Sequence, residues 1–182
     1  MKLKIIIENT VFQSDAKAEL GFCLYIETED NHKILFDIGQ TDLFAYNAQL
    51  FDIDINEIDS LVLSHGHYDH TGGIEKFLQL NNHADIYIKE GYDTPKFNKI
   101  GKYIGVPTNI HIPQDRLHIT KEITKIAEGI YIIPNIKIYD ARSKERFLAI
   151  APEPRNGLVG GHIPNSLNLP FELVLDGNRY KT

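Results

Sequence analysis

The chain has 182 residues, 42% of them hydrophobic and 24% charged, which is enough for a globular core and argues against disorder. Its formal net charge is −6, and lysines and arginines are interspersed with acids, so we expect neither nucleic acid nor an anionic membrane as a partner. Residues 1–8 hold too short an apolar run for a signal peptide, and no later segment could span a bilayer. We therefore expect a cytoplasmic protein.

Hydrophobic periodicity predicts helices packed on a sheet. The expected strands are 3–8, 20–28, 33–37, 60–64 and 84–88, and the expected helices are 42–50 and 71–80. Thr41 or Asp42 is expected to cap the first helix. Residues 89–118 should be mostly irregular, and 119–133 return to a helix or strand pattern.

Cys23 is the only cysteine, so the chain can form no internal disulfide and no zinc site built on cysteine pairs. It lies in the β-rich run 21–27, and no base is evident beside it. This context favours a thiol packed in a strand over a nucleophile.

Three histidines and a carboxylate fall within six consecutive positions, directly after the apolar run 61–63. These residues are His65, His67, Asp69 and His70. Imidazole nitrogen and carboxylate oxygen suit zinc, iron or manganese, and a site without sulfur ligands is more often catalytic than structural. Gly72 and Gly73 allow the chain to turn tightly after them. The alternative interpretation is a solvated polar loop.

This spacing resembles the His-x-His-x-Asp-His hallmark of the metallo-β-lactamase superfamily, and the preceding segment 34–40 resembles the strand that supports the metal loop there. The resemblance implies a metal site, with one or two zinc ions, or iron or manganese, held by His65, His67, Asp69 and His70. It also implies that Asp69 accepts a proton from metal-bound water and that Asp37 orients the ligands without binding metal. The sequences at 8–10 and 64–73 look most like those of small hydrolase-like proteins related to dihydropteroate-type synthases.

The sequence pattern changes from about Asn135 onward. The segments 138–147, 152–155 and 160–170 resemble the catalytic rhodanese domain of thiosulfate and 3-mercaptopyruvate sulfurtransferases. The resemblance implies that Arg146 holds an anionic sulfur donor, whereas the alternative is an arginine on a solvated helix. No cysteine follows in the tail to carry sulfur, so we expect no sulfurtransferase activity.

We therefore predict an α/β protein in which 1–133 is a partial metallo-β-lactamase-type αββα arrangement and 134–182 is a truncated rhodanese-like α/β segment. The superfamily's later metal ligands have no recognisable counterpart. The remaining histidines with no ligand context are His83, His111, His118 and His162. The expected function is a metal-dependent hydrolase, impaired by the missing ligands and acting on an unknown small molecule. The alternatives are a non-catalytic fusion or remnant protein and a truncated sulfurtransferase; a homodimer could supply ligands from a second copy.

Overall fold

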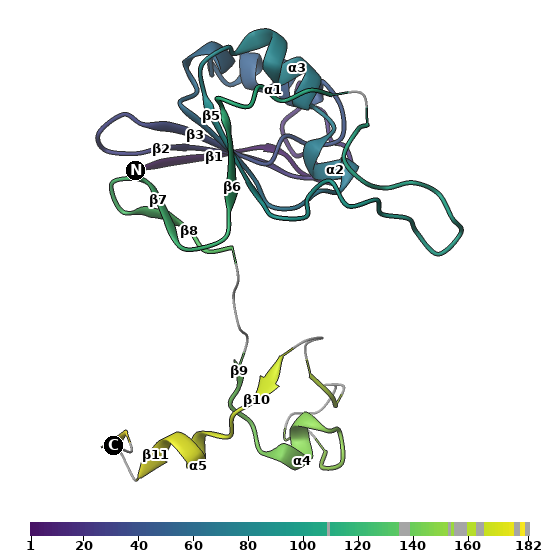
Figure 1. Ribbon diagram of the computed structural model, residues 1–182, viewed down its shortest axis with the longest axis vertical. Coiled ribbons are helices and arrows are strands. Elements are labelled where there is room, and N and C mark those ends of the chain that lie inside the picture. Colours follow the sequence, from purple (N-terminus) through teal and green to yellow (C-terminus); the bar gives the residue numbers. More distant parts are fainter. Residues whose placement is uncertain are drawn as a thin grey trace. The chain divides into compact units, whose positions relative to one another are not determined.

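The computed structural model describes residues 1–108, 110–134, 139–152, 154, 160–162, 166–176 and 179–180. Contacts divide the chain into two compact units, Met1–Pro134 and Asn135–Thr182 (Figure 1). Whether each unit folds as an independent domain stays a prediction. No helix in the described part of the chain is both long and apolar enough to cross a membrane.

A six-stranded mixed sheet with the order β1-β2-β3-β4-β5-β6 forms the framework of the first unit. Its strands are β1 (Lys2–Ile7), β2 (Cys23–Glu27), β3 (Lys33–Phe36), β4 (Ser60–Leu63), β5 (Asp85–Lys89) and β6 (Leu117–Thr120). β1 to β3 pair antiparallel, and β3 to β6 pair parallel. The carboxyl ends of β3 and β4 therefore lie side by side, and Asp37 and Ser64 follow them directly.

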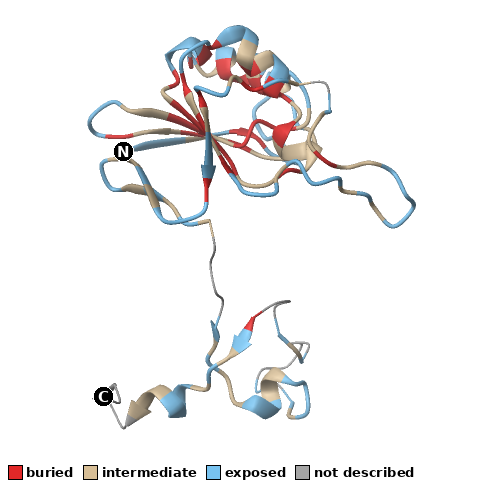
Figure 2. Cartoon of the chain, in the orientation of Figure 1, coloured by how far each residue is buried: buried red, intermediate tan, exposed pale blue. Residues whose placement is uncertain are grey.

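Helices α1 (Leu43–Leu50) and α3 (Ile74–Leu80) lie over one face of this sheet (Figure 1). Buried residues lie along the strands and in these helices (Figure 2). Phe44 of α1 and Phe77 of α3 are fully buried, and all four residues of β4 are buried, as expected of a central parallel strand. This arrangement confirms the predicted α/β class, and the structure shows that the sheet is mixed.

The second predicted helix starts later than expected. A separate short helix, α2 (Tyr68–Thr71), comes first, and Gly72 and Gly73 divide it from α3. Asp69 and His70 therefore lie inside a one-turn helix rather than before a long one. At α1, the hydroxyl of Thr41 accepts a hydrogen bond from the backbone N–H of Leu43, while the Asp42 side chain makes no capping bond.

The pattern at 119–133 is resolved in favour of strands. β7 (Thr124–Ala127) and β8 (Ile130–Ile132) form an antiparallel hairpin, and a short 3-10 helix, η1 (Ile55–Glu57), lies earlier in the chain. The stretch before β6 is mostly irregular, as predicted. Arg116, at its end, is buried and donates to the backbone oxygens of Asn81 and Ala84.

The second unit is built from very short elements. β9 (Tyr139–Asp140) pairs parallel with β10 (Leu167–Asn168), and β11 (Leu175–Asp176) pairs antiparallel with β12 (Arg179–Tyr180). Its helices are α4 (Lys144–Phe147) and α5 (Phe171–Val174). Among its described residues no large hydrophobic side chain is buried, so this unit has no core comparable to that of the first. Part of the rhodanese-like segments, at 138, 153, 155 and 163–165, lies outside the described residues.

Candidate metal centre

His65 and His67 lie between β4 and α2, whereas Asp69 and His70 lie in α2; together these four candidate ligands occupy the turn 65–70. Buried β4 fixes the start of this turn, and α2 fixes its end. Two backbone hydrogen bonds join the turn to the neighbouring strand end: Asp37 N donates to the carbonyl of Val62, and Ile38 N donates to that of His70. The loop is therefore held against the segment that follows β3.

Asp37 lies at the centre of the hydrogen bonds behind this turn. It is 1% exposed and has a φ of 57°, a left-handed conformation that is uncommon for a residue with a side chain. Its Oδ1 accepts from the backbone N–H of Ser64 at 2.8 Å. Its Oδ2 accepts from the Ser64 hydroxyl at 2.7 Å and lies 2.8 Å from Nδ1 of His70. Of the candidate ligands, Asp37 thus contacts His70 directly, and its role in orienting them stays a prediction.

His65 and His67 present two ring nitrogens to each other. Nε2 of His65 lies 3.0 Å from Nδ1 of His67. Two nitrogens that are each about 2.0–2.1 Å from a tetrahedral zinc ion lie roughly 3.3 Å apart. The separation of these two nitrogens is therefore within a few tenths of an ångström of that between two ligands of one zinc ion.

Asp69 and His70 form a second pair of donors. Oδ2 of Asp69 lies 3.7 Å from Nε2 of His70, and the His70 and His65 rings approach with centroids 4.3 Å apart. Because His70 turns its Nδ1 toward Asp37, its Nε2 is the atom that faces Asp69. The donor types and their pairwise spacing fit a divalent cation such as zinc.

The described residues contain no group of three or more His, Cys, Asp and Glu side chains arranged to hold a metal ion. The turn at 65–70 therefore offers donors in pairs. A catalytic zinc ion needs about three protein ligands. We expect such pairs to bind a metal ion more weakly than a complete site would.

Two histidines of the turn titrate in opposite directions. The hydrogen bond to Asp37 raises the pKa of His70 above its usual value, against the opposing effect of partial burial. Partial burial lowers the pKa of His65, and the neighbouring charges of His70 and His67 lower it further. His65 is therefore the ring of the two that keeps its second proton only at the lower pH.

This difference predicts the pH dependence of the metal-free protein. The His70 contribution to stability should be complete below the unfolded pKa of about 6.5 and should be lost as pH rises through the raised folded pKa. His65 should instead cost stability as pH falls below about 6.5. We expect NMR titration with a chelator present to give a midpoint above 6.5 for His70 and below it for His65. Asp37→Asn should lower the His70 midpoint; an unchanged midpoint would contradict the assignment.

Three glycines allow the turn to pack tightly against its surroundings. A Cβ added to Gly21 would lie 2.0 Å from the carbonyl oxygen of Asp69, and one added to Gly72 would lie 2.0 Å from that of Gln40. One added to Gly66 would lie 1.9 Å from the carbonyl oxygen of Tyr92. The sequence pattern indicated Gly72 but missed the other two, because their close neighbours are distant in the chain.

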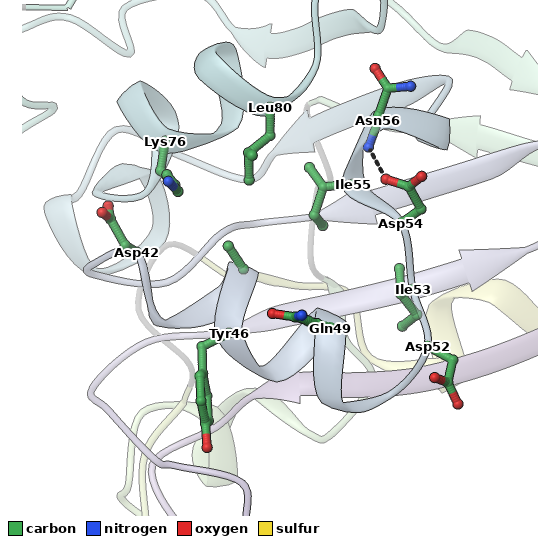
Figure 3. A pocket seen from close by; sticks show the side chains of 11 residues that line it. Asp42, Tyr46, Gln49, Asp52, Ile53, Asp54, Ile55, Asn56, Lys76 and Leu80 are labelled. Atoms are coloured by element: carbon green, nitrogen blue, oxygen red, sulfur yellow. Dashed lines mark hydrogen bonds between the residues drawn. The ribbon is translucent and has the colours of Figure 1, made fainter.

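Two hollows of the first unit differ in their relation to the turn. One, of about 860 Å³, lies over α1, α3 and the segment between α1 and β4, and none of its lining residues belongs to 65–70 (Figure 3). A smaller cavity of about 100 Å³ lies beside the turn, with Leu63, Thr71, Tyr92 and His111 among its lining residues. Neither was predicted, because both are lined by segments far apart in sequence.

Other residues singled out from the sequence lie elsewhere. Nε2 of His118, in β6, lies 2.8 Å from Oδ1 of Asp85, in β5. Cys23 is a fully buried thiol in a strand, as predicted, and burial raises its pKa. In the second unit, His162 stacks on Phe147. Arg146 is half-buried in the four-residue helix α4. The pKa of Asp140 is lowered to about 2, mainly by the hydrogen bond from Arg142 and to a smaller extent by the positive charge of Arg146.

Comparison with known proteins gives two kinds of similarity. The profile of the Metallo-beta-lactamase superfamily matches residues 16–166. An uncharacterized protein of Methanocaldococcus jannaschii is 34% identical over 187 residues, covering 98% of this chain and 61% of that protein. A probable 3-mercaptopyruvate sulfurtransferase of Schizosaccharomyces pombe is 58% identical over 45 residues, covering 25% of this chain and 13% of that protein. Both resemblances inferred from the sequence are confirmed.

The crystal structure of Tm1679, a metal-dependent hydrolase of the beta-lactamase superfamily, shares the fold. It is 23% identical, with a TM-score of 0.54, over 71% of this chain and 46% of that chain. The chain thus spans less than two thirds of the length of these relatives.

Proposed function

Because the chain belongs to the metallo-β-lactamase superfamily, we propose that it is the metal-binding part of a metal-dependent hydrolase and binds a divalent cation at the turn 65–70. The observation that carries this proposal is the 3.0 Å approach of His65 Nε2 to His67 Nδ1, beside the Asp69 and His70 pair. Zinc is the metal we favour, because imidazole and carboxylate donors at these spacings suit it; iron and manganese take the same donors.

Each residue has a distinct task in this proposal. His65 and His67 bind the cation together, and Asp69 and His70 supply the second pair of donors. When bound, a metal ion of this kind lowers the pKa of a coordinated water toward about 7. Asp69 is the residue we assign as proton acceptor, since its carboxylate lies in the turn and its side chain is 22% exposed. Asp37 holds His70 and Ser64 in place.

The sheet and its helices correspond, in this proposal, to half of an αββα arrangement. The fold shared with Tm1679 supports it. Leu3 and Ile5 of β1 are 55% and 56% exposed, as expected of a sheet that carries apolar side chains for a further layer. The further layer would then complete a pocket for a small-molecule substrate.

Thermal unfolding of metal-stripped protein, with and without zinc, tests the metal site. A ligand at about 100 times its Kd that binds only the folded state adds about 2.7 kcal/mol. For a chain of this size we expect a rise in Tm of about 5–10 °C. His65→Ala/His67→Ala should abolish the rise, whereas His83→Ala, at an exposed histidine, should retain it. A rise that survives the double substitution would place the metal elsewhere.

Metal binding without turnover is the second candidate function. The observation that supports this second candidate is that the described residues bring no three metal donors together. Hydrolysis of a chromogenic ester by the zinc-loaded protein separates the two candidates. Turnover lost in His65→Ala/His67→Ala would support the hydrolase, and no turnover above that of zinc in buffer would support binding alone.

A further inference from the structure

We propose that Ser64 is a positioning residue that sets the tautomer of His65, so that Nε2 of this ring is the atom free of a proton. Through Ser64 on one side and His70 on the other, Asp37 would then align both pairs of donors. The metal-binding part of this inference rests on the proposed function; the tautomer does not.

The direction of each hydrogen bond follows from what the groups can donate. A carboxylate only accepts, so the Ser64 hydroxyl donates its single proton to Oδ2 of Asp37, 2.7 Å away. The same hydroxyl oxygen lies 2.9 Å from Nδ1 of His65. With its proton already committed, it can only accept there, so Nδ1 of His65 carries the ring proton.

The assignment extends to the neighbouring rings. A neutral His65 protonated on Nδ1 has its lone pair on Nε2, which must accept at the 3.0 Å contact with Nδ1 of His67. His70 donates from Nδ1 to the Oδ2 atom that also accepts from Ser64. One carboxylate oxygen therefore orients one histidine of each donor pair, directly at His70 and through a hydroxyl at His65.

This arrangement prepares His65 for a metal ion. A metal binds the unprotonated nitrogen, and the hydrogen bond at the other nitrogen selects which one that is. Without the hydroxyl, Nδ1 of the half-buried His65 would lose its hydrogen-bond acceptor, and its proton could move to Nε2, the nitrogen that the metal ion needs. At His67, the Nδ1 proton of the 3.0 Å contact has to move to Nε2 of the same ring before this nitrogen binds a metal ion.

Ser64→Thr and Ser64→Val form a matched pair of variants. Threonine and valine have nearly the same shape, but threonine keeps the hydroxyl, whereas valine has a methyl group in its place. The backbone N–H of residue 64, which donates to Oδ1 of Asp37, is present in both. A difference between the two variants therefore reports on the hydroxyl and not on volume.

Long-range 1H–15N NMR of the metal-free protein at about pH 8, where histidines are largely neutral, reads the tautomer directly. A His65→Asn spectrum identifies the His65 signals by their loss. We expect the Nδ1–H tautomer in the unsubstituted chain and in Ser64→Thr, and loss of that preference in Ser64→Val. An Nε2–H tautomer in the unsubstituted chain, or the same tautomer in Thr and Val variants, would overturn the inference.

Zinc affinity, measured by competition with a chromophoric chelator, gives the second readout. Loss of an outer hydrogen bond to a metal ligand typically weakens binding about 10- to 100-fold. We expect Ser64→Val to bind zinc at least tenfold more weakly than Ser64→Thr, and equal affinities would contradict the positioning role. If the unsubstituted chain binds no zinc, the proposed function fails, while the tautomer is still decided by the metal-free spectra.

Discussion

Asp37→Ala is expected to destabilise the first unit by about 3–5 kcal/mol. Three donors, the Ser64 N–H, the Ser64 hydroxyl and Nδ1 of His70, would lose their acceptor, and each group left unsatisfied costs about 1–3 kcal/mol. Partial exposure of Ser64 and His70 lets water replace some of these bonds, so the sum lies below the maximum. Urea unfolding of the metal-free protein measures the loss.

A control separates hydrogen bonding from backbone strain. Asp52 has the same φ of 57°, but it is exposed, so Asp52→Ala carries the left-handed strain without burial. We expect it to cost about 1 kcal/mol. Asp37→Asn should fall between the two, because its amide oxygen can still accept one bond. Equal losses for Asp37→Ala and Asp52→Ala would contradict the central role of the Asp37 carboxylate.

Gly21→Ala is expected to have the second large effect. The added Cβ would lie 2.0 Å from the carbonyl oxygen of Asp69 and 3.3 Å from Cα of Gly39. Both neighbours are backbone atoms, which cannot rotate away, and φ is +127° at this glycine. The metal turn or the segment before β2 must therefore shift. We expect a loss of about 3 kcal/mol or more, as in overpacked cores.

Gly129→Ala is the matched control in the β7–β8 turn. Its φ is +73°, and an added Cβ meets nothing within 4 Å. It should cost only the conformational strain, about 1–2 kcal/mol. We also expect Gly21→Ala to weaken zinc binding and Gly129→Ala to leave it unchanged, because only Gly21 contacts the turn. Equal effects of the two substitutions on both measurements would contradict this packing.

The strands of the first unit were predictable because their patterns are local. The run before Ser64 is apolar at each position of β4 after the first, as a strand buried on both faces requires. The start of α3 was predicted too early, because the predicted range 71–80 included Gly72 and Gly73, which separate α2 from α3. Helical spacing alone does not detect such a break.

The candidate ligands were found because they are adjacent in sequence. The residues that hold these candidate ligands in place could be predicted only in part, because their contacts join segments that are distant in the sequence. Gly21 meets Asp69 across 48 positions, and the Ser64 hydroxyl acquires its role only when β3 places Asp37 beside it. Local periodicity carries no information on such pairs, whereas the resemblance to a family supplied Asp37.

Zinc X-ray absorption spectroscopy of the protein loaded with one equivalent of metal tests the central claim most directly, because it counts the imidazoles bound to the ion. The pairing of His65 Nε2 with His67 Nδ1 at 3.0 Å predicts at least two imidazoles, with the remaining ligands oxygen or nitrogen. In His65→Ala/His67→Ala the zinc should be lost or should bind with fewer imidazoles. An unchanged imidazole count in that variant would contradict a metal site in the turn 65–70.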